Sequence, residues 1–394
     1  MTRRQWLHAT AAPAAILALG ACTSRRPRRP VAVPYARPYS RQPFRPPRVS
    51  DDRVIRTVTG LRPFRPSGFV VRSENTASKR LIHNYGHGGG GVTLSWGCAQ
   101  LAARRAADVA DRRAAVLGCG VIGLSTARVL QDRGWTVTIY ARDLPPETTS
   151  NVAGALWSPT SVYDTKALTP AFEAQHADAA RLSHRAFQTL VGGGYGVRWL
   201  EQYYLNDRET DLPSYVRSLP DLYPGARVLQ PGEHPFPVAH VSRVITMMIE
   251  PSIYLRRLLS DFRTAGGSVV VREFTHISET TDLEEPVVFN CTGLGAGTLV
   301  TDTELIPIKG QTSFVPPDAD VDFATIGGGS GSLYMFPRSD GILLGGTFER
   351  NVATLEPDSN ETARIVRGHQ ALFDAMRRGA SVSCEHSTPF GPGG

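Results

Sequence analysis

The chain has 394 residues, with 43 Lys and Arg against 36 Asp and Glu, and a formal net charge of +7. Residues 1–50 hold ten arginines and no acidic residue, so 33 basic and 36 acidic residues remain in the rest of the chain. Because the basic excess is confined to this segment, the charge excludes a nucleic-acid-binding domain. It favours an anionic membrane surface as the partner of the segment.

An export signal is predicted at the N-terminus, where Arg3 and Arg4 resemble a twin-arginine motif. The apolar run 9–19 that follows is shorter than the roughly 20 residues of a transmembrane helix. Cys22 ends a segment that resembles a bacterial lipoprotein cleavage box; the alternative is an ordinary cleaved signal with an incidental cysteine. We expect residues 1–22 to be a signal peptide with a lipidated Cys22, which places the protein on the outer face of the bacterial cytoplasmic membrane.

Residues 23–50 are rich in arginine and proline and are expected to form an extended tether. Residues 51–394 are numerous enough for two domains interleaved in sequence. The remaining cysteines, at positions 98, 119, 291 and 384, show neither CxxC nor His-paired spacing. The sequence therefore predicts no metal site and no disulfide framework.

A βαβ unit is predicted over residues 114–143. An apolar strand leads into Gly118, Gly120 and Gly123, and a helical segment and a second strand follow. Gly118 would permit the tight turn, Gly120 would let the backbone approach a pyrophosphate, and Gly123 would let the helix pack on the strand. Asp143 lies 20 residues beyond Gly123, where a ribose-binding acid is expected. The unit predicts a dinucleotide-binding fold but does not choose between NAD and FAD.

Residues 81–99 resemble the closing signature of the D-amino-acid oxidase family. In that family the signature lies near the C-terminus, whereas here it precedes the Gly118 loop, which opens the family's chains. The order implies a circular permutation, with the family's ends fused through residues 111–113 and a new break between a helix at 361–378 and a strand near Val54. Residues near Arg378 should then lie close to Asp51, and residues 114–118 should lie centrally in the nucleotide sheet.

The segments 141–145, 148–150, 152–157 and 289–297 carry the same resemblance, which implies FAD as the cofactor. The amides of the glycine run 88–91 would face the pyrimidine edge of the flavin, where negative charge develops on reduction; the alternative is a flexible loop. Residues 309–311 look like the family's turn into the substrate-domain sheet. The cofactor-binding residues implied are Gly118, Gly120, Val121, Ile122, Gly123, Arg142, Asp143, Thr148, Thr149, Gly154, Ala155, Leu156, Gly293, Gly88, Gly89, Gly91, Val92 and Thr93.

Arg62 and Tyr334 are the implied substrate carboxylate ligands. Arg62 opens a segment that resembles the family's Arg-Pro-x-Arg-Pro, and a guanidinium fork matches a carboxylate bidentately. Tyr334 begins a segment that resembles the strand with the family's carboxylate-binding tyrosine. The alternatives are a surface arginine in a proline-rich linker and a core tyrosine. Gly329–Gly331 stands where some members carry a second tyrosine, so a short lid is expected.

The expected fold is α/β, with a Rossmann-like FAD-binding domain interleaved with an α+β substrate domain that has a mixed or antiparallel sheet. We expect the FAD domain at 51–160 and 270–300, with 51–113 permuted, the substrate domain at 161–269 and 301–380, and a disordered tail at 381–394. The implied reaction oxidises a D-amino acid with dioxygen to a 2-oxo acid, ammonia and hydrogen peroxide. Alternatives are an oxidase of glycine, an N-methyl amino acid or D-aspartate, and an inactive flavin-binding surface lipoprotein. The oligomeric state is not predicted.

Overall fold

The computed structural model describes residues 44–76, 78–328 and 333–385. The predicted export signal with Cys22, residues 23–43 of the tether, Gly329–Gly331 and residues 386–394 lie outside the described residues. Within the described ranges, no helix combines the length and the apolar character that crossing a membrane requires.

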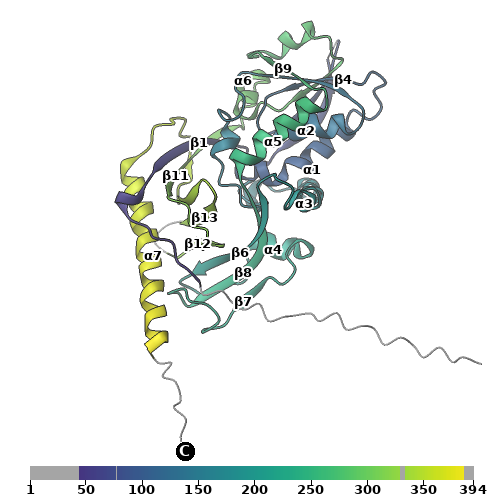
Figure 1. Ribbon diagram of the computed structural model, residues 1–394. Coiled ribbons are helices and arrows are strands. Elements are labelled where there is room, and N and C mark those ends of the chain that lie inside the picture. The colour runs from purple at the N-terminus through teal and green to yellow at the C-terminus, as the bar shows by residue number, and fades with distance from the viewer. Residues whose placement is uncertain (1–43, 77, 329–332, 386–394) are drawn as a thin grey trace, which may run out of the picture. The chain divides into compact units, whose positions relative to one another are not determined.

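One sheet of the structure has six strands, of which five are parallel (Figure 1). Its central strands are short runs of small and branched apolar residues that are almost wholly buried, as is usual for parallel strands covered on both faces. β2 alone pairs antiparallel, with β3. In spatial order the strands are β2 (Val70–Asn75), β3 (Arg80–Tyr85), β10 (Val287–Asn290), β4 (Arg113–Leu117), β5 (Thr136–Ala141) and β9 (Ser268–Val271).

Helices cover both faces of this sheet. The larger apolar core lies under α1 (Gly91–Arg104), α2 (Val121–Gln131), α3 (Pro170–Leu190) and α5 (Pro251–Thr264). The smaller core on the other face includes Leu299 of α6 (Ala296–Leu299). The first turn of α3 illustrates the local rules: the Thr169 side chain accepts a hydrogen bond from the Phe172 amide, and proline occupies the first helical position.

The second sheet has nine strands, and only its β12–β6 pair is parallel among those described. Alternate residues of its strands face opposite sides, so strands such as β11, β13 and β14 contribute to an apolar cluster on each face. The path of the sheet is β1 (Arg56–Phe64), β11 (Ile306–Val315), β14 (Gly341–Gly345), β13 (Tyr334–Arg338), β12 (Phe323–Gly327), β6 (Val197–Asn206), β8 (His240–Ile249) and β7 (Arg227–Leu229), with β15 (Glu349–Arg350) also paired to β11. The short α4 (Ser214–Ser218) lies between β6 and β7 in sequence.

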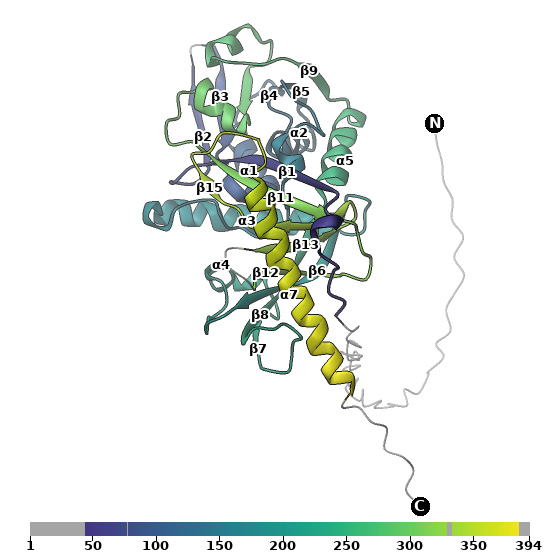
Figure 2. The ribbon, with the colours of Figure 1, turned by 90° about the vertical axis from the view of Figure 1, so that its left-hand side faces the viewer.

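The long helix α7 (Ser359–Glu385) crosses one face of the nine-stranded sheet (Figure 2). We call this side the α7 face; Val366 and Phe373 of the helix are buried there with Met335 and Leu344 of the sheet. We call the opposite side the cavity face. It carries a separate apolar cluster that includes Phe314 and Phe336.

The residues before β1 also belong to the core on the α7 face. The Phe44 ring packs edge-on against Tyr203, Phe236 and Phe323, at centroid distances of 5.4, 5.6 and 5.2 Å. Val49 is 4% exposed. The predicted tether boundary at residue 50 is therefore wrong, because two apolar side chains among the prolines are enough to dock residues 44–49 on the fold.

The predicted organisation of the chain needs four corrections. β1 pairs along its whole length with β11, so residues 56–64 belong to the nine-stranded sheet and not to the nucleotide sheet. α3 and α5 pack with α1 and α2, and β9 pairs with β5, so much of 161–269 lies with the six-stranded sheet. Residues 309–311 lie inside β11 rather than in a turn. The predicted tail starts too early as well, since α7 continues to Glu385.

The two neighbourhoods expected for a permuted chain are both present. Arg377 of α7 donates hydrogen bonds to the carbonyl oxygens of Pro46 and Pro47, at 3.3 and 3.0 Å, and α7 contacts the segment Asp51–Arg53. β4 lies between β10 and β5 in the middle of the parallel sheet. The end of α7 near Arg377 therefore lies beside the segment that leads into Asp51, and residues 114–117 are central in the parallel sheet.

Candidate active site

A cavity of about 690 Å³ runs between the carboxyl ends of the parallel strands and the cavity face of the nine-stranded sheet. Every implied cofactor or substrate residue among the described ones lines it, except Gly123. Open α/β sheets bind their ligands at this edge. Sequence segments as distant as β1, α1, α2, η7 (Gly293–Gly295) and β13 thus meet around one space.

The three glycines of the GxGxxG turn have different surroundings. Gly118 has φ +103°, and a Cβ placed on it would lie 2.6 Å from the Cys291 carbonyl oxygen. A Cβ on Gly123 would lie 1.9 Å from the Gly118 carbonyl oxygen, so this glycine serves helix packing, consistent with its place outside the cavity lining. A Cβ placed on Gly120 would have only the Ser150 hydroxyl oxygen near it, at 3.2 Å. The cavity side of Gly120 is therefore open for a ligand.

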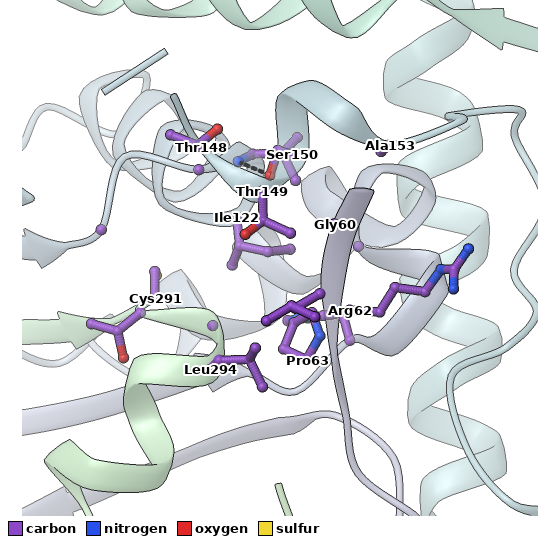
Figure 3. Close-up of a pocket in the computed structure, with 18 of the residues that line it drawn as sticks. Gly60, Arg62, Pro63, Ile122, Thr148, Thr149, Ser150, Ala153, Cys291 and Leu294 are labelled. Carbon is purple, nitrogen blue, oxygen red and sulfur yellow. Dashed lines mark hydrogen bonds between the residues drawn. The ribbon is translucent and has the colours of Figure 1, made fainter. Parts of the chain in front are cut away.

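Hydroxyl groups gather at the N-terminus of α2. The Ser150 hydroxyl accepts a hydrogen bond from the Val121 amide at 3.0 Å, and the Thr148 hydroxyl donates to Asn151 at 2.8 Å. Figure 3 shows Thr148, Thr149 and Ser150 on one side of the cavity, with Cys291 and Leu294 across from them. A helix N-terminus surrounded by hydroxyls is suited to phosphate oxygens.

Asp143 follows the next strand, β5, as expected for a ribose ligand. The Arg142 guanidinium donates to one of its carboxylate oxygens at 2.8 and 2.9 Å, and also to Glu273 at 3.0 Å. These hydrogen bonds raise the pKa of Arg142. The carboxylate of Asp143 is 42% exposed and lines the cavity, so one of its edges remains open to a hydroxyl ligand.

The glycine run at 88–91 has a regular conformation, with a 3-10 helix over Gly88–Gly90, and two of its amides are hydrogen-bonded within the protein. The Gly89 amide donates to the Ser161 carbonyl at 2.8 Å, and the Gly90 amide donates to the His87 carbonyl at 3.0 Å. These two amides are therefore already paired within the protein, and the prediction that amides of the run face the flavin can apply only to the others. The first amides of α1, at Gly91, Val92 and Thr93, lie at the helix end, where no intrahelical acceptor exists.

Arg62 and Tyr334 both line the cavity, from strands β1 and β13 (Figure 3 shows Arg62). The Arg62 guanidinium makes two long hydrogen bonds, both at 3.5 Å, to the carbonyl oxygens of Lys309 and Thr347, and lies 5.6 Å from the centroid of the Phe348 ring. The Tyr334 ring stacks on Phe336 with centroids 5.0 Å apart. Neither side chain is held by a carboxylate among the described residues, so both are free to bind an anion.

Several cavity residues were not predicted. Ser150 and Cys291 lie inside segments that the resemblance covers, but nothing local distinguished them from their neighbours. Asn84 is fully buried in β3, and its side-chain carbonyl oxygen has no partner among the described residues. His87 is buried against Phe69, and burial lowers its pKa to about 3, so its imidazole is neutral. A polar residue within an apolar strand was the available signal for Asn84.

The open backbone at Gly120, the hydroxyl cluster at the α2 N-terminus and the unpartnered Asn84 oxygen fit a dinucleotide. The model of the FAD dependent oxidoreductase family matches residues 16–105 and 113–390. The chain belongs to this family. Its cofactor is FAD, and the residues just described would hold the pyrophosphate and ribose.

Named relatives agree with this assignment. The chain is 33% identical to a D-amino-acid oxidase of Rubrobacter xylanophilus over 283 residues, 71% of this chain and 82% of the relative. It is 35% identical to a D-amino-acid oxidase of Streptomyces coelicolor over 269 residues, 67% of this chain and 79% of the relative. A glycine oxidase structure from Bacillus cereus superposes with a TM-score of 0.52 at 16% identity, covering 68% of this chain and 79% of that one. The last likeness shows the fold alone.

Proposed function

We propose that this FAD-dependent oxidoreductase oxidises a D-amino acid to a 2-oxo acid, ammonia and hydrogen peroxide. The observation that carries the proposal is the position of Arg62 and Tyr334 on the wall of the FAD cavity, where no carboxylate of the described residues pairs with either side chain. The relatives named D-amino-acid oxidase, at 33% and 35% identity, support the same reaction.

The protein's contribution is orientation. The Arg62 guanidinium would grip the substrate carboxylate with two parallel hydrogen bonds, and the Tyr334 hydroxyl would bind the same group from another strand. When FAD is bound it supplies the two-electron oxidation and the reduction of dioxygen. Holding the carboxylate at two points fixes the position and tilt of that group beside the cofactor, and such positioning lowers the barrier.

A neutral D-amino acid fits the cavity better than D-aspartate. Of the described residues that line the cavity, the cations are Arg62, Arg142 and Arg272. Arg142 and Arg272 follow the strands β5 and β9, at the ribose end, and Arg142 is already paired with two carboxylates. One cation therefore remains for one substrate carboxylate. Glycine and N-methyl amino acids stay as alternative substrates of the same site.

The test is to supply the holoenzyme with D-alanine, D-aspartate, glycine and N-methylglycine and to measure 2-oxo acid, ammonia and hydrogen peroxide together. We expect all three products in equal amounts from D-alanine, with weaker turnover of D-aspartate. A flavin-loaded protein that forms no product from any member of the panel would instead support the inactive surface lipoprotein.

We infer that the chain is a circular permutation of the family order. Three observations support the inference: the early position of the 81–99 signature, the hydrogen bonds from Arg377 to Pro46 and Pro47, and a family match in two blocks that leaves out residues 106–112. Tandem mass spectrometry of a peptide of the native protein that runs from residues 81–99 into residues 118–123 tests whether the two segments occur in this order in one chain.

We also propose that the protein is exported with FAD bound and anchored through Cys22. Arg3, Arg4 and the cleavage box around Cys22 support this proposal. Contacts to FAD come from segments far apart in sequence, so the cofactor requires a folded chain, and a twin-arginine signal suits export in the folded state. Replacing both arginines with lysine should leave flavin-loaded precursor inside the cell. Cys22→Ala should release the exported protein from the membrane with its flavin spectrum unchanged.

A further inference from the structure

A buried hydroxyl in the cavity has no hydrogen-bond partner. Thr312 lies on β11, lines the cavity and is 5% exposed. Its hydroxyl makes no hydrogen bond to any described residue. Because a buried polar group without a partner costs free energy, native proteins pair nearly all of them with protein, water or ligand. An unpaired hydroxyl that faces a ligand cavity therefore points to a partner on the ligand.

The strand register places Thr312 between the two carboxylate ligands. Thr312 pairs with Gly345 of β14, and Gly345 pairs with Tyr334 of β13. On its other side β11 pairs with β1, where Arg62 lies opposite Ile308. Residues 308, 310 and 312 share one face because side chains alternate along a strand. Thr312, Arg62 and Tyr334 therefore all project from the cavity face.

Gly310 and Gly345 leave room for the side chains of Arg62 and Tyr334 on either side of Thr312. A Cβ placed on Gly310 would lie 2.4–2.5 Å from three atoms of the Arg62 guanidinium, so this group lies directly over Gly310. A Cβ on Gly345 would lie 2.5 Å from the Tyr334 hydroxyl oxygen and 2.1 Å from its ring carbon. Gly310 is two residues from Thr312 on the same face, and Gly345 lies directly across from it. The Arg62 guanidinium and the Tyr334 hydroxyl therefore each lie over a glycine that neighbours Thr312 on the cavity face.

We propose that Thr312 is a third substrate-binding residue, whose hydroxyl donates a hydrogen bond to the carboxylate held by Arg62 and Tyr334. The assignment rests on the proposed function, since it takes the substrate to be a carboxylate. A carboxylate has about four lone-pair sites, so a fork from Arg62 and one bond from Tyr334 leave an acceptor free. Thr312 would then fix the tilt of the carboxylate plane.

The experiment compares the wild-type holoenzyme with Thr312→Val, which keeps the side-chain shape, and Thr312→Ser, which keeps the hydroxyl. Benzoate, a carboxylate that cannot be oxidised, is titrated against the flavin absorbance, and KM and kcat are measured with D-alanine. A hydrogen bond to a charged group is worth about tenfold or more in affinity. We expect Thr312→Val to weaken benzoate binding and raise KM by about tenfold, and Thr312→Ser to stay within about threefold of the wild type.

Thr325→Val is the matched control. Thr325 is also fully buried with an unpartnered hydroxyl, but it lies opposite Met335, whose side chain packs on the α7 face. This variant should bind benzoate and FAD as the wild type does. An unchanged benzoate affinity in Thr312→Val overturns the assignment. So does a change in FAD affinity without a change in benzoate affinity, because the hydroxyl would then serve the cofactor. If the wild-type holoenzyme binds benzoate but its flavin is not reduced by D-alanine, the proposed function fails. The benzoate affinities of the variants still test the role of Thr312.

Discussion

At the scale of single residues, the substrate end of the cavity depends on a few groups that the fold leaves without partners. Arg62 and Tyr334 have no carboxylate beside them among the described residues, and Thr312 has no acceptor or donor. In a protein interior, such groups are costly unless a ligand completes them. The free-energy cost of leaving these polar groups unpaired therefore indicates that this end of the cavity binds a ligand.

Arg62→Ala should lower kcat/KM for D-alanine by at least about tenfold to a hundredfold, because a charge-assisted hydrogen bond is worth about 1.5–3 kcal/mol. FAD should remain bound, since the pyrophosphate and ribose residues lie on other strands. Arg62→Lys should recover only part of the loss, because an ammonium lacks the planar fork. Steady-state kinetics with flavin content measured in parallel checks this; equal kcat/KM in Arg62→Ala and wild type would remove Arg62 from the site.

Gly345→Ala should displace the Tyr334 ring, because the added Cβ would fall 2.1 Å from a ring carbon. We expect an increase of about tenfold in KM for D-alanine, comparable to losing one hydrogen bond to a charged group. Gly297→Ala is the control, since its nearest neighbour would be at 3.7 Å and it lies in α6, away from the substrate end. If Gly345→Ala and Gly297→Ala show the same KM, the Tyr334 ring is not set by this contact.

At the scale of elements, the two sheets have separate tasks. The six-stranded sheet presents strand ends and helix N-termini to FAD, whereas the nine-stranded sheet presents side chains from its cavity face to the substrate. α7 and residues 44–49 support the nine-stranded sheet from behind. A change on the α7 face should therefore affect stability more than chemistry.

Phe44→Ala should destabilise the fold by about 1.5–3 kcal/mol, the usual effect of removing a large apolar side chain from a partly buried site. The Phe44 ring packs against Tyr203 and Phe323 of the nine-stranded sheet and against Phe236 of the segment between β7 and β8, so its loss removes three aromatic contacts. Urea unfolding of the holoenzyme measures the change, with Ile55→Ala as control because Ile55 is 50% exposed. Equal midpoints for the two variants would mean that residues 44–49 do not contribute to the folded unit.

The sequence predicted local elements well and their partners less well. The order of β4, α2 and β5 follows from an apolar run, three glycines and a helical period, and the structure confirms it. The local sequence did not predict that β1 pairs with β11 rather than with β3. This pairing joins residues more than two hundred positions apart, as in Gly60 opposite Gly310. Thr312 was missed for a related reason: a threonine in a strand is ordinary until its neighbours in space are known.

At the scale of the whole molecule, stability should depend on pH through buried histidines, three of which have strongly lowered pKa values. Burial lowers the pKa of His87 to about 3 and those of His176 and His369 to about 4. These values lie below the ordinary value of about 6.5, so the unfolded chain takes up protons before the folded one does. The stability that they contribute is present above about pH 6.5 and is lost as the pH falls from there toward 4.

Each such histidine changes the free energy of unfolding by up to about 1.4 kcal/mol per pH unit in that window. Urea unfolding at pH 7, 6 and 5 should therefore show falling stability, and His176→Asn should flatten the dependence by removing one of the three contributions. The same slope in the variant and the wild type would mean that other groups cause the acid sensitivity.

The central claim, that Arg62 and Tyr334 present a D-amino acid to FAD, is tested most directly by adding D-alanine to the holoenzyme without oxygen. The account predicts that the flavin absorbance near its long-wavelength maximum is lost with D-alanine, is retained with L-alanine, and returns when air is admitted. A flavin that stays oxidised with D-alanine and with every other D-amino acid, in a protein that binds FAD and is folded, would contradict it.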